Sequence, residues 1–249
     1  MGKSFEYIYP INYYNLDVGL KCKITSIFDF LCDIGMQQSE RLEVGVDKLL
    51  EKNLTWVFYK YNLKVYRYPG FGENIKIKTI PTGFKKFYAY REYFLYDEED
   101  NLIAEGMSLF FLIDINRRRP SRIPKDLYEA YGCNGDIDEA IPMNEPDKLE
   151  EAQYAKEFYV RYSDIDSNKH VNNTRYVEWA LEVVPQEIIT NYSLEDINIV
   201  FIKEITYGHM VRTMCATEEQ EGNKIKIVHL IKDDEGNDIT SLTSIWKKI

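Results

Sequence analysis

A dense run of polar side chains stands in the second half of the sequence, directly before a stretch of helical periodicity. Asp166, Asn168 and His170 occupy alternate positions, so an extended segment would turn all three toward one side. Carboxylate, amide and imidazole groups suit proton transfer and the holding of a water or a substrate. The alternative is ordinary turn and helix-capping chemistry, which Asp and Asn before a helix usually perform.

A second candidate is a carboxylate inside an apolar, strand-like run farther along the chain. Glu204 interrupts this run, and a solvent-facing strand residue is the alternative, because Lys203 beside it shows that the run accepts charge. When the two halves are matched on the turns at Tyr68 and Tyr207, the first half has Val65 at this position. The ionisable group therefore belongs to the second half alone.

Metal chemistry does not fit these residues. The run that begins at Asp164 resembles the start of an EF-hand loop, but Lys169 stands where that loop needs glycine. His170, His209 and His229 have no metal-ligand spacing in the sequence. We expect no metal site.

The elements that must position these groups occur twice. Apolar residues at helical spacing in 24–34 precede strand-like runs at 54–68, 75–81, 87–96 and 102–113, the last two joined by a turn at 97–101. The second half repeats this order with a helix at 176–184, runs at 197–207, 211–218, 224–232 and 239–249, and a turn at 233–237. Thr25 or Ser26 can cap the first helix and Asn172 or Asn173 the second, which Pro185 ends. Each half is predicted to be an α+β unit, one helix on an antiparallel sheet.

The first copy lacks most of the polar set. An offset of 149 residues sets Asp17 opposite Asp166. It also places Gly19 and Lys21 where the second copy has Asn168 and His170. A purely structural loop would have little reason for this asymmetry, so we predict one active site, in the second half.

Composition narrows the class of protein. The 249 residues carry 31 Lys and Arg against 41 Asp and Glu, and a net charge of −10 argues against a general nucleic-acid binder. The four cysteines are scattered and are predicted to be free thiols in a reducing compartment. No run approaches the roughly 18 apolar residues of a membrane span, and no signal peptide is recognisable. We expect a cytoplasmic protein.

The run from Asp164 to Tyr176, with Asn168-Lys169-His170-Val171-Asn172-Asn173 at its core, resembles the signature of plant and bacterial fatty acyl-ACP thioesterases. The first half agrees with that family at Arg67-Tyr68-Pro69, and the resemblance spans nearly the whole chain. It implies a tandem double hot-dog fold, each unit a central helix wrapped by a curved antiparallel sheet. It also implies hydrolysis of fatty acyl-ACP thioesters, which releases free fatty acid and holo-ACP in fatty acid biosynthesis and needs no cofactor.

The resemblance also assigns roles to residues. The catalytic positions of the family fall on Asp166, Asn168, His170 and Glu204. Many plant members carry cysteine directly after the glutamate, whereas this chain has Ile205, so we expect direct attack by water. Backbone N–H groups of residues 171–173 are candidates to stabilise the oxyanion.

We divide the chain into an N-terminal hot-dog unit at 1–115, a linker at 116–155 and a C-terminal catalytic unit at 156–249. The first unit is expected to bind the acyl chain, and the predicted substrate-binding residues are Ile27, Phe28, Leu31, Asn172 and Asn173. Ordinary core packing is the alternative for the three apolar residues.

A basic run in the linker is the candidate docking site for the acidic carrier protein. Its members are Arg117, Arg118, Arg119 and Arg122, and electrostatic steering is the physical reason. A solvated basic turn is the alternative. Competing functions are an acyl-CoA thioesterase and a non-catalytic acyl-chain sensor, and a homodimer is a further expectation.

Overall fold

The structure is a computed structural model that describes residues 2–166 and 168–249. Ser167 of the polar run lies outside the described residues. The chain forms two compact units: unit 1 comprises Met1–Tyr59 and Val65–Met143, and unit 2 comprises Lys60–Lys64 and Asn144–Ile249. Each unit combines one principal helix with an antiparallel sheet, as the repeat predicts.

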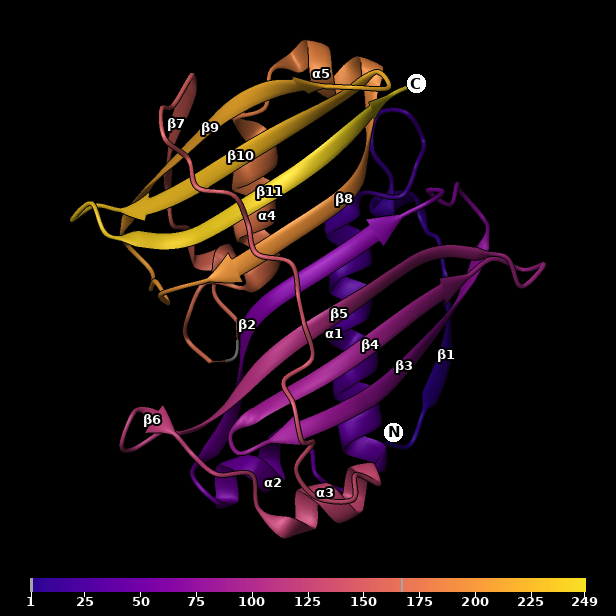
Figure 1. The fold of residues 1–249 in the computed structure, drawn as a ribbon, viewed down its shortest axis with the longest axis vertical. Helices are drawn as coiled ribbons and strands as arrows, with labels where there is room; N and C mark the ends of the chain where they lie inside the picture. Colours follow the sequence, from indigo (N-terminus) through magenta and orange to yellow (C-terminus); the bar gives the residue numbers. More distant parts are fainter. Residues whose placement is uncertain (1, 167) are drawn as a thin grey trace. The chain divides into compact units, whose positions relative to one another are not determined.

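Unit 1 is organised around helix α1 (Ile24–Arg41), which contacts β1 (Phe5–Pro10) and β3 (Asn74–Lys85). The strand order is β1-β3-β4-β5-β2, with β4 (Tyr88–Tyr96), β5 (Leu102–Asp114) and the first part of β2 (Leu54–Val65) (Figure 1). Side chains spaced three and four residues apart on α1, Ile27, Phe28, Leu31 and Ile34, are all buried. This spacing gives the helix a continuous apolar stripe toward the sheet.

Shorter elements close one end of unit 1. They are α2 (Val46–Glu51), α3 (Lys125–Tyr131) and β6 (Arg119–Pro120), which pairs with the end of β5. Leu127 of α3 is buried in a cluster with Phe84 and Leu112 from the sheet. The predicted linker therefore contains two ordered elements at its start.

Unit 2 is organised around helix α4 (Asn173–Glu182), which contacts β9 (Met210–Gln220) and β10 (Lys224–Asp233). Its strand order is β8-β11-β10-β9-β7, with β8 (Tyr192–Phe201), β11 (Asp238–Lys248) and β7 (Tyr154–Tyr159), and residues 60–64 of β2 pair with β8. Pro185 follows α4 and serves as the N-cap of α5 (Gln186–Asn191).

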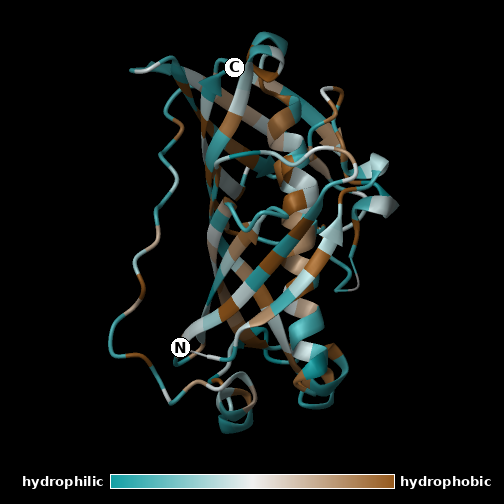
Figure 2. Cartoon of the chain, turned by 90° about the vertical axis from the view of Figure 1, so that its right-hand side faces the viewer, coloured by the Kyte–Doolittle hydropathy of each residue, from teal (hydrophilic) through white to brown (hydrophobic). Residues whose placement is uncertain are grey.

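The sheet of unit 2 buries one side of each strand. A row across four strands consists of Cys215, His229, Leu242 and Ile199, which are neighbours in the strand register and are all buried. Figure 2 shows hydrophobic residues interspersed along the strands with hydrophilic ones. This alternation is the period-two pattern expected of a sheet with a helix on one face.

Residues before β7 hold the outer side of this sheet. The Asn144 N–H donates to Asn62 Oδ1 over 2.8 Å, and Asn62 Nδ2 donates back to the Asn144 carbonyl over 3.0 Å. The Asp147 N–H donates to Thr243 Oγ1 over 2.7 Å.

Across the described residues, no helix has the length and apolar character needed to cross a bilayer.

Two sequence expectations about these elements are wrong, and two strands were not predicted. The strand predicted at 197–207 begins at Tyr192 and ends at Phe201, because the N–H groups of Ile202 and Lys203 both turn to the Ile239 carbonyl. Edge strands β1 and β7 were not predicted, since β7 is exposed along most of its length and shows no apolar alternation.

The predicted cap of the first helix is also wrong. Thr25 and Ser26 lie inside the first turn of α1 and are buried, and Lys23 is the N-cap without a side-chain hydrogen bond. The Ser26 hydroxyl donates instead to the Asn15 carbonyl over 3.3 Å. In unit 2 the expectation holds, because Asn172 caps α4.

Candidate active site

Two of the predicted catalytic side chains are in contact. His170 Nε2 lies 3.3 Å from Glu204 Oε2, although the residues are 34 positions apart in the chain. Their side chains are 29% and 39% exposed, respectively. The pair therefore lies where both a water and a substrate can reach it.

The polar run forms a tight turn. The Asp166 N–H donates to the His170 carbonyl over 2.9 Å, and the Lys169 N–H donates to the Asp166 carbonyl over 3.0 Å. Lys169 has a φ of 67°, in the left-handed region that closes such turns. The run is therefore a turn and not the extended segment in which the three alternate side chains would share one side, because local hydrogen bonds of Asp compete with extended structure.

Asp166 organises this turn through its own side chain. Its Oδ1 accepts the Asn168 N–H over 2.8 Å, which fixes the backbone between Asp166 and His170. The Asn168 side chain is exposed. Within the described parts of the chain, no hydrogen bond joins its amide group to His170 or Glu204. The structure thus places Asp166, Asn168 and His170 on one turn and brings Glu204 from another segment into contact with His170.

A buried carboxylate fixes the chain directly before the turn. Asp164 accepts the Arg161 N–H over 2.8 Å and two bonds from the Arg161 guanidinium, at 3.1 and 2.8 Å. Burial alone would raise the pKa of Asp164, but the hydrogen bonds from Arg161 hold that pKa below its usual value. Asp164 is therefore a charged anchor next to the site.

The turn and the Glu204 segment are also joined through the backbone. The Val171 N–H donates to the Ile205 carbonyl over 2.9 Å, and the Asn172 N–H donates to the Asp164 carbonyl over 2.8 Å. These two N–H groups are thereby engaged and do not fit the oxyanion role predicted for residues 171–173. Asn173, at the start of α4, is the remaining candidate.

The sequence did not mark Tyr176 as part of this site. Its hydroxyl is hydrogen-bonded to the Ile205 backbone, and its ring lies on the buried face of α4. Burial raises the pKa of Tyr176 above its usual value, and the nearby charges of Glu204 and Asp166 act in the same direction. Its position corresponds to Ile27 in the first copy, so a hydroxyl on an otherwise apolar helix face was the available signal.

Unit 1 contains the same turn without the chemistry. The Asp17 N–H donates to the Lys21 carbonyl over 2.8 Å, and the Gly19 N–H donates to Asp17 Oδ1 over 2.8 Å. Leu20 has a φ of 58°, like Lys169 in the second turn. These bonds confirm that Asp17 corresponds to Asp166.

The counterpart of Glu204 differs from the one predicted. The Cys22 N–H donates to the Pro69 carbonyl over 2.8 Å, as Val171 donates to Ile205. The backbone N–H groups of Tyr66 and Arg67 both donate to the Ile103 carbonyl. In unit 2 the N–H groups of Ile202 and Lys203 donate to the Ile239 carbonyl in the same way. Tyr68 therefore stands opposite Glu204, and the matching of Tyr68 with Tyr207, which gave Val65, is wrong.

The predicted substrate-binding residues have other visible partners. Ile27, Phe28 and Leu31 lie in the core of unit 1. Asn172 Oδ1 accepts the Thr174 N–H over 2.9 Å and caps α4, and Asn173 is the first residue of that helix.

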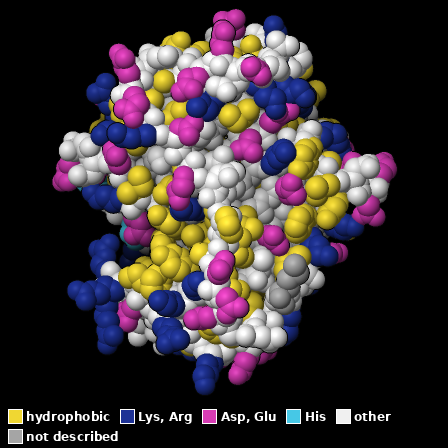
Figure 3. Space-filling view, in the orientation of Figure 1, with side chains coloured by type: hydrophobic (Ala, Val, Ile, Leu, Met, Phe, Trp, Pro, Cys, Tyr) yellow, Lys and Arg dark blue, Asp and Glu magenta, His cyan; other side chains and the backbone are white. Residues whose placement is uncertain are grey.

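The basic run lies at the turn between β5 and β6 of unit 1. Arg117, Arg118, Arg119 and Arg122 are all exposed. Arg117 Nε is 3.8 Å from Asp114, and Arg122 Nη2 is 4.0 Å from Asp136. Figure 3 shows Lys and Arg side chains gathered at the edge where Figure 1 places β6.

No group of three or more His, Cys, Asp or Glu side chains is arranged to hold a metal ion in the part of the chain that the structure describes.

The model of the acyl-ACP thioesterase N-terminal domain matches residues 2–131, and that of the acyl-ACP thioesterase C-terminal domain matches residues 147–248. The chain belongs to the acyl-ACP thioesterase family.

Named relatives of this acyl-ACP thioesterase family member agree with that assignment. Oleoyl-acyl carrier protein thioesterase 1 of Arabidopsis thaliana is 23% identical over 99% of this chain and 77% of its own length. An acyl-[acyl-carrier-protein] hydrolase of Cuphea viscosissima is 22% identical over 99% of this chain, which spans 63% of that relative. These names agree with the predicted hydrolysis of acyl-ACP thioesters, and the predicted family and enzyme class are confirmed.

Solved structures agree with the fold. A crystal structure from Lactobacillus plantarum has a TM-score of 0.95 at 22% identity and covers 100% of this chain and 97% of its own. The 12:0-ACP thioesterase from Umbellularia californica has a TM-score of 0.87 at 20% identity, covering 99% and 94%. The predicted α+β hot-dog architecture is confirmed.

Proposed function

We propose that this acyl-ACP thioesterase family member hydrolyses fatty acyl-ACP thioesters at His170 and Glu204. The observation that carries the proposal is the 3.3 Å contact between these two partly exposed side chains, of which His170 lies on the turn held by Asp166. An imidazole and a carboxylate in contact are the parts of a general acid–base pair.

The reaction follows from the pair. A water held by His170 and Glu204 loses a proton to the pair as its oxygen attacks the thioester carbonyl carbon. The tetrahedral intermediate then expels the sulfur, and the proton passes to that sulfur as the C–S bond breaks. The products are a free fatty acid and the thiol of holo-ACP. General acid–base catalysis of this kind contributes roughly 10²–10⁴-fold.

Asp166 and Asn168 act beside the pair. Asp166 fixes the turn through the Asn168 N–H, which holds the Asn168 amide at the surface from which a substrate approaches. That amide would hold the attacking water or the substrate. The Asn173 N–H at the start of α4 would stabilise the oxyanion, a contribution typically worth roughly 10²–10³-fold per donor.

Cysteine chemistry is not part of the proposal. Ile205 occupies the position after Glu204, and burial raises the pKa of both Cys22 and Cys215 to about 12. Such thiols are poor nucleophiles because the reactive thiolate is scarce. The free cysteines also fit a reducing compartment, and we place the reaction in the cytoplasm.

Unit 1 would bind the acyl chain and the carrier, and unit 2 would perform catalysis. Ile27, Phe28 and Leu31 are the proposed acyl-binding residues on α1, and Asn172 and Asn173 are the proposed substrate-binding residues on α4. The exposed arginines at the β5–β6 turn, chiefly those at positions 118 and 119, would attract the acidic ACP. A homodimer is the proposed assembly, because β1 and β7 stand at the two ends of the strand order in the described residues, and edge strands can pair with another chain.

The test is turnover of acyl-ACPs of medium and long chain length by the wild type and by His170→Ala, with matching acyl-CoAs beside them. We expect turnover on acyl-ACP that falls at least about a hundredfold in the variant. Higher kcat/KM on acyl-CoA would assign CoA as the carrier. Binding of acyl-ACP without hydrolysis by the wild type would contradict the proposal and favour an acyl-chain sensor.

A further inference from the structure

The segment that carries Glu204 is tied at both ends to one turn of unit 2. Before it, Lys203 Nζ lies 2.7 Å from Asp233 Oδ2. After it, His209 Nδ1 lies 3.0 Å from Asp234 Oδ2. The turn that joins β10 and β11 thus acts as a clamp, defined here as Lys203, Asp233, His209 and Asp234.

The clamp residue Asp233 is itself rigidly held. Its Oδ1 accepts the N–H groups of Glu235 and Asn237, over 3.1 and 2.8 Å, and Asn237 Nδ2 donates to Oδ2 over 3.0 Å. The ion pair with Lys203 and the bonds from Asn237 hold the pKa of Asp233 well below its usual value. Asp233 is therefore a fixed negative charge that Lys203 can reach.

The segment has attachments besides the clamp on both sides of Glu204. Residues 202–209 lie between β8 and β9 outside any helix or strand. The backbone around Glu204 is held by two attachments, where the N–H groups of Ile202 and Lys203 donate to the Ile239 carbonyl and where the Ile205 carbonyl accepts the Val171 N–H. Farther along the segment, the His209 carbonyl accepts the Val160 N–H over 2.9 Å. The Glu204 side chain is placed between these two attachments, next to the clamped Lys203, so the direction of residue 203 bears directly on Glu204.

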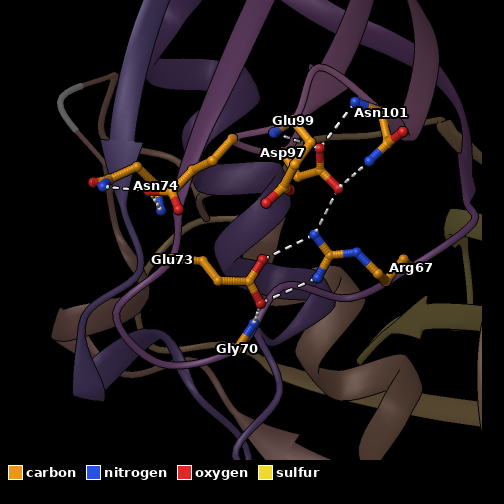
Figure 4. Close-up of polar contacts among 8 residues, drawn as sticks. Arg67, Gly70, Glu73, Asn74, Asp97, Glu99 and Asn101 are labelled. Carbon is orange, nitrogen blue, oxygen red and sulfur yellow. Dashed lines mark hydrogen bonds and ion pairs between the residues drawn. The ribbon is translucent and has the colours of Figure 1, made fainter.

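Unit 1 carries a related clamp around a residue with no catalytic assignment, and Figure 4 shows that its Arg67 contacts Glu73 as well as Asp97. Arg67 Nη2 lies 3.1 Å from Asp97 Oδ2, and Asn74 Nδ2 donates to Glu98 Oε1 over 2.8 Å. Tyr68 is the residue enclosed. In both units a basic side chain before the enclosed residue pairs with the first Asp of the hairpin turn, and only in unit 2 is the enclosed residue a catalytic candidate.

We infer that Lys203 and Asp233 are positioning residues for Glu204, keeping its carboxylate within reach of His170. The inference rests on the proposed catalytic role of Glu204. A misplacement of about 1 Å can cost roughly a hundredfold in rate, because the reacting geometry must be nearly correct before reaction. A tie that only stabilised the fold would act alike in both units.

The experiment compares substitutions of the corresponding basic side chains, Lys203 in unit 2 and Arg67 in unit 1. Lys203→Met is expected to lower kcat roughly 10- to 100-fold with KM within about twofold, since substrate binding does not involve the tie. Arg67→Met, the control in unit 1, removes contacts with both Glu73 and Asp97 and should leave kcat within about twofold, although its Tm should fall at least as much as that of Lys203→Met. Lys203→Arg, which copies the residue of unit 1, should restore most of the lost kcat.

A second readout does not depend on turnover. The chain has three histidines, so the His170 Cε1–H signal can be assigned in the NMR spectrum by comparison with His170→Ala. At fixed pH this signal should move in Lys203→Met, because the neighbouring Glu204 carboxylate moves, and stay in place in Arg67→Met. Asp233→Asn, with Asp97→Asn as its control, serves if Lys203→Met does not fold.

The outcomes separate the inference from the proposed function. Equal losses of kcat in the two units, or an unmoved His170 signal in both unit 2 variants, would overturn the positioning role. A wild type without turnover on any thioester would overturn the proposed function instead. In that case the His170 signal alone decides whether the clamp holds Glu204.

Discussion

The turn at Asp17 in unit 1 and the turn at Asp166 in unit 2 are held by corresponding hydrogen bonds. In both, Asp Oδ1 accepts the N–H two residues ahead over 2.8 Å, and the Asp N–H donates to a carbonyl four residues ahead. The backbone is thus a scaffold that both halves build. What differs is the set of side chains placed on it, since only unit 2 adds an imidazole to meet a carboxylate.

The interiors of the units show the same relation. Ser108 Oγ donates to the Tyr93 hydroxyl over 3.2 Å in unit 1, and His229 Nε2 lies 3.2 Å from Ser244 Oγ in unit 2. Each pair bridges the strands of the hairpin that ends in the clamp turn. Unit 2 has the imidazole of His229 where unit 1 has the phenol of Tyr93. Only the imidazole can take up a proton at mildly acidic pH, which links the stability of unit 2 to pH.

The comparison breaks first at the catalytic carboxylate. Glu204→Gln keeps the shape of the side chain but removes its ability to take a proton, so we expect kcat to fall roughly 10²–10⁴-fold. Tyr68→Phe removes the polar group at the corresponding position of unit 1 and should leave kcat within about twofold. Steady-state hydrolysis of one acyl-ACP by both variants measures the difference.

Thermal unfolding of the same two variants is the control, because a loss of kcat that follows a loss of fold says nothing about catalysis. Equal kcat values for Glu204→Gln and the wild type would remove Glu204 from the mechanism. A large fall in Tyr68→Phe would show that the first turn also takes part in the reaction.

Several of these features were predictable from local sequence. The repeat, the first helix and the hairpin turns at 97–101 and 233–237 follow from periodicity and turn residues, which act over a few positions. Glu204 and His170 were both found because each interrupts a pattern. Their 3.3 Å contact was not derivable from the residues, since it depends on how β8 leaves the sheet.

The errors also have physical causes. Periodicity extended the strand through Glu204 because apolar residues continue beyond Phe201, although the backbone N–H groups of the next two residues turn to Ile239. The equivalence of Tyr68 and Glu204 is visible in these backbone hydrogen bonds, whereas the residue types do not indicate it. Matching similar tyrosines therefore gave the wrong counterpart. The clamps could not be predicted either, because they join residues that are far apart in the sequence.

A smaller effect sharpens the comparison of the interiors. Burial lowers the pKa of His229 from 6.5 to about 3, so the unfolded chain binds a proton in that range that the folded chain does not. The stability due to the neutral ring is fully present above pH 6.5 and is lost progressively as pH falls toward 3. At pH 5 the loss is about 2 kcal/mol relative to pH 7, at about 1.4 kcal/mol per pH unit.

His229→Gln should remove this dependence, because the amide does not titrate. Urea unfolding at pH 7, 6 and 5 gives the free energy of unfolding of unit 2 in each variant. Tyr93→Phe is the matched control in unit 1 and should keep the slope of the wild type. An unchanged slope in His229→Gln would mean that other groups govern the acid sensitivity.

The smallest effect concerns the starts of the two helices. Asn172 accepts the Thr174 N–H and caps α4, whereas Lys23 precedes α1 without a side-chain bond. Asn172→Ala should cost about 1 kcal/mol, and Lys23→Ala should stay within about 0.5 kcal/mol, because only the first removes a partner from an N-terminal N–H group. Amide hydrogen exchange in the first turn of each helix reports the local cost. Faster exchange in α4 of Asn172→Ala, without a change in α1 of Lys23→Ala, would show that only the helix of the catalytic half depends on a side-chain cap. Equal changes in both helices would mean that the hydrogen bond of Asn172 contributes nothing that Lys23 lacks, and that packing by the sheet alone holds each helix start in place.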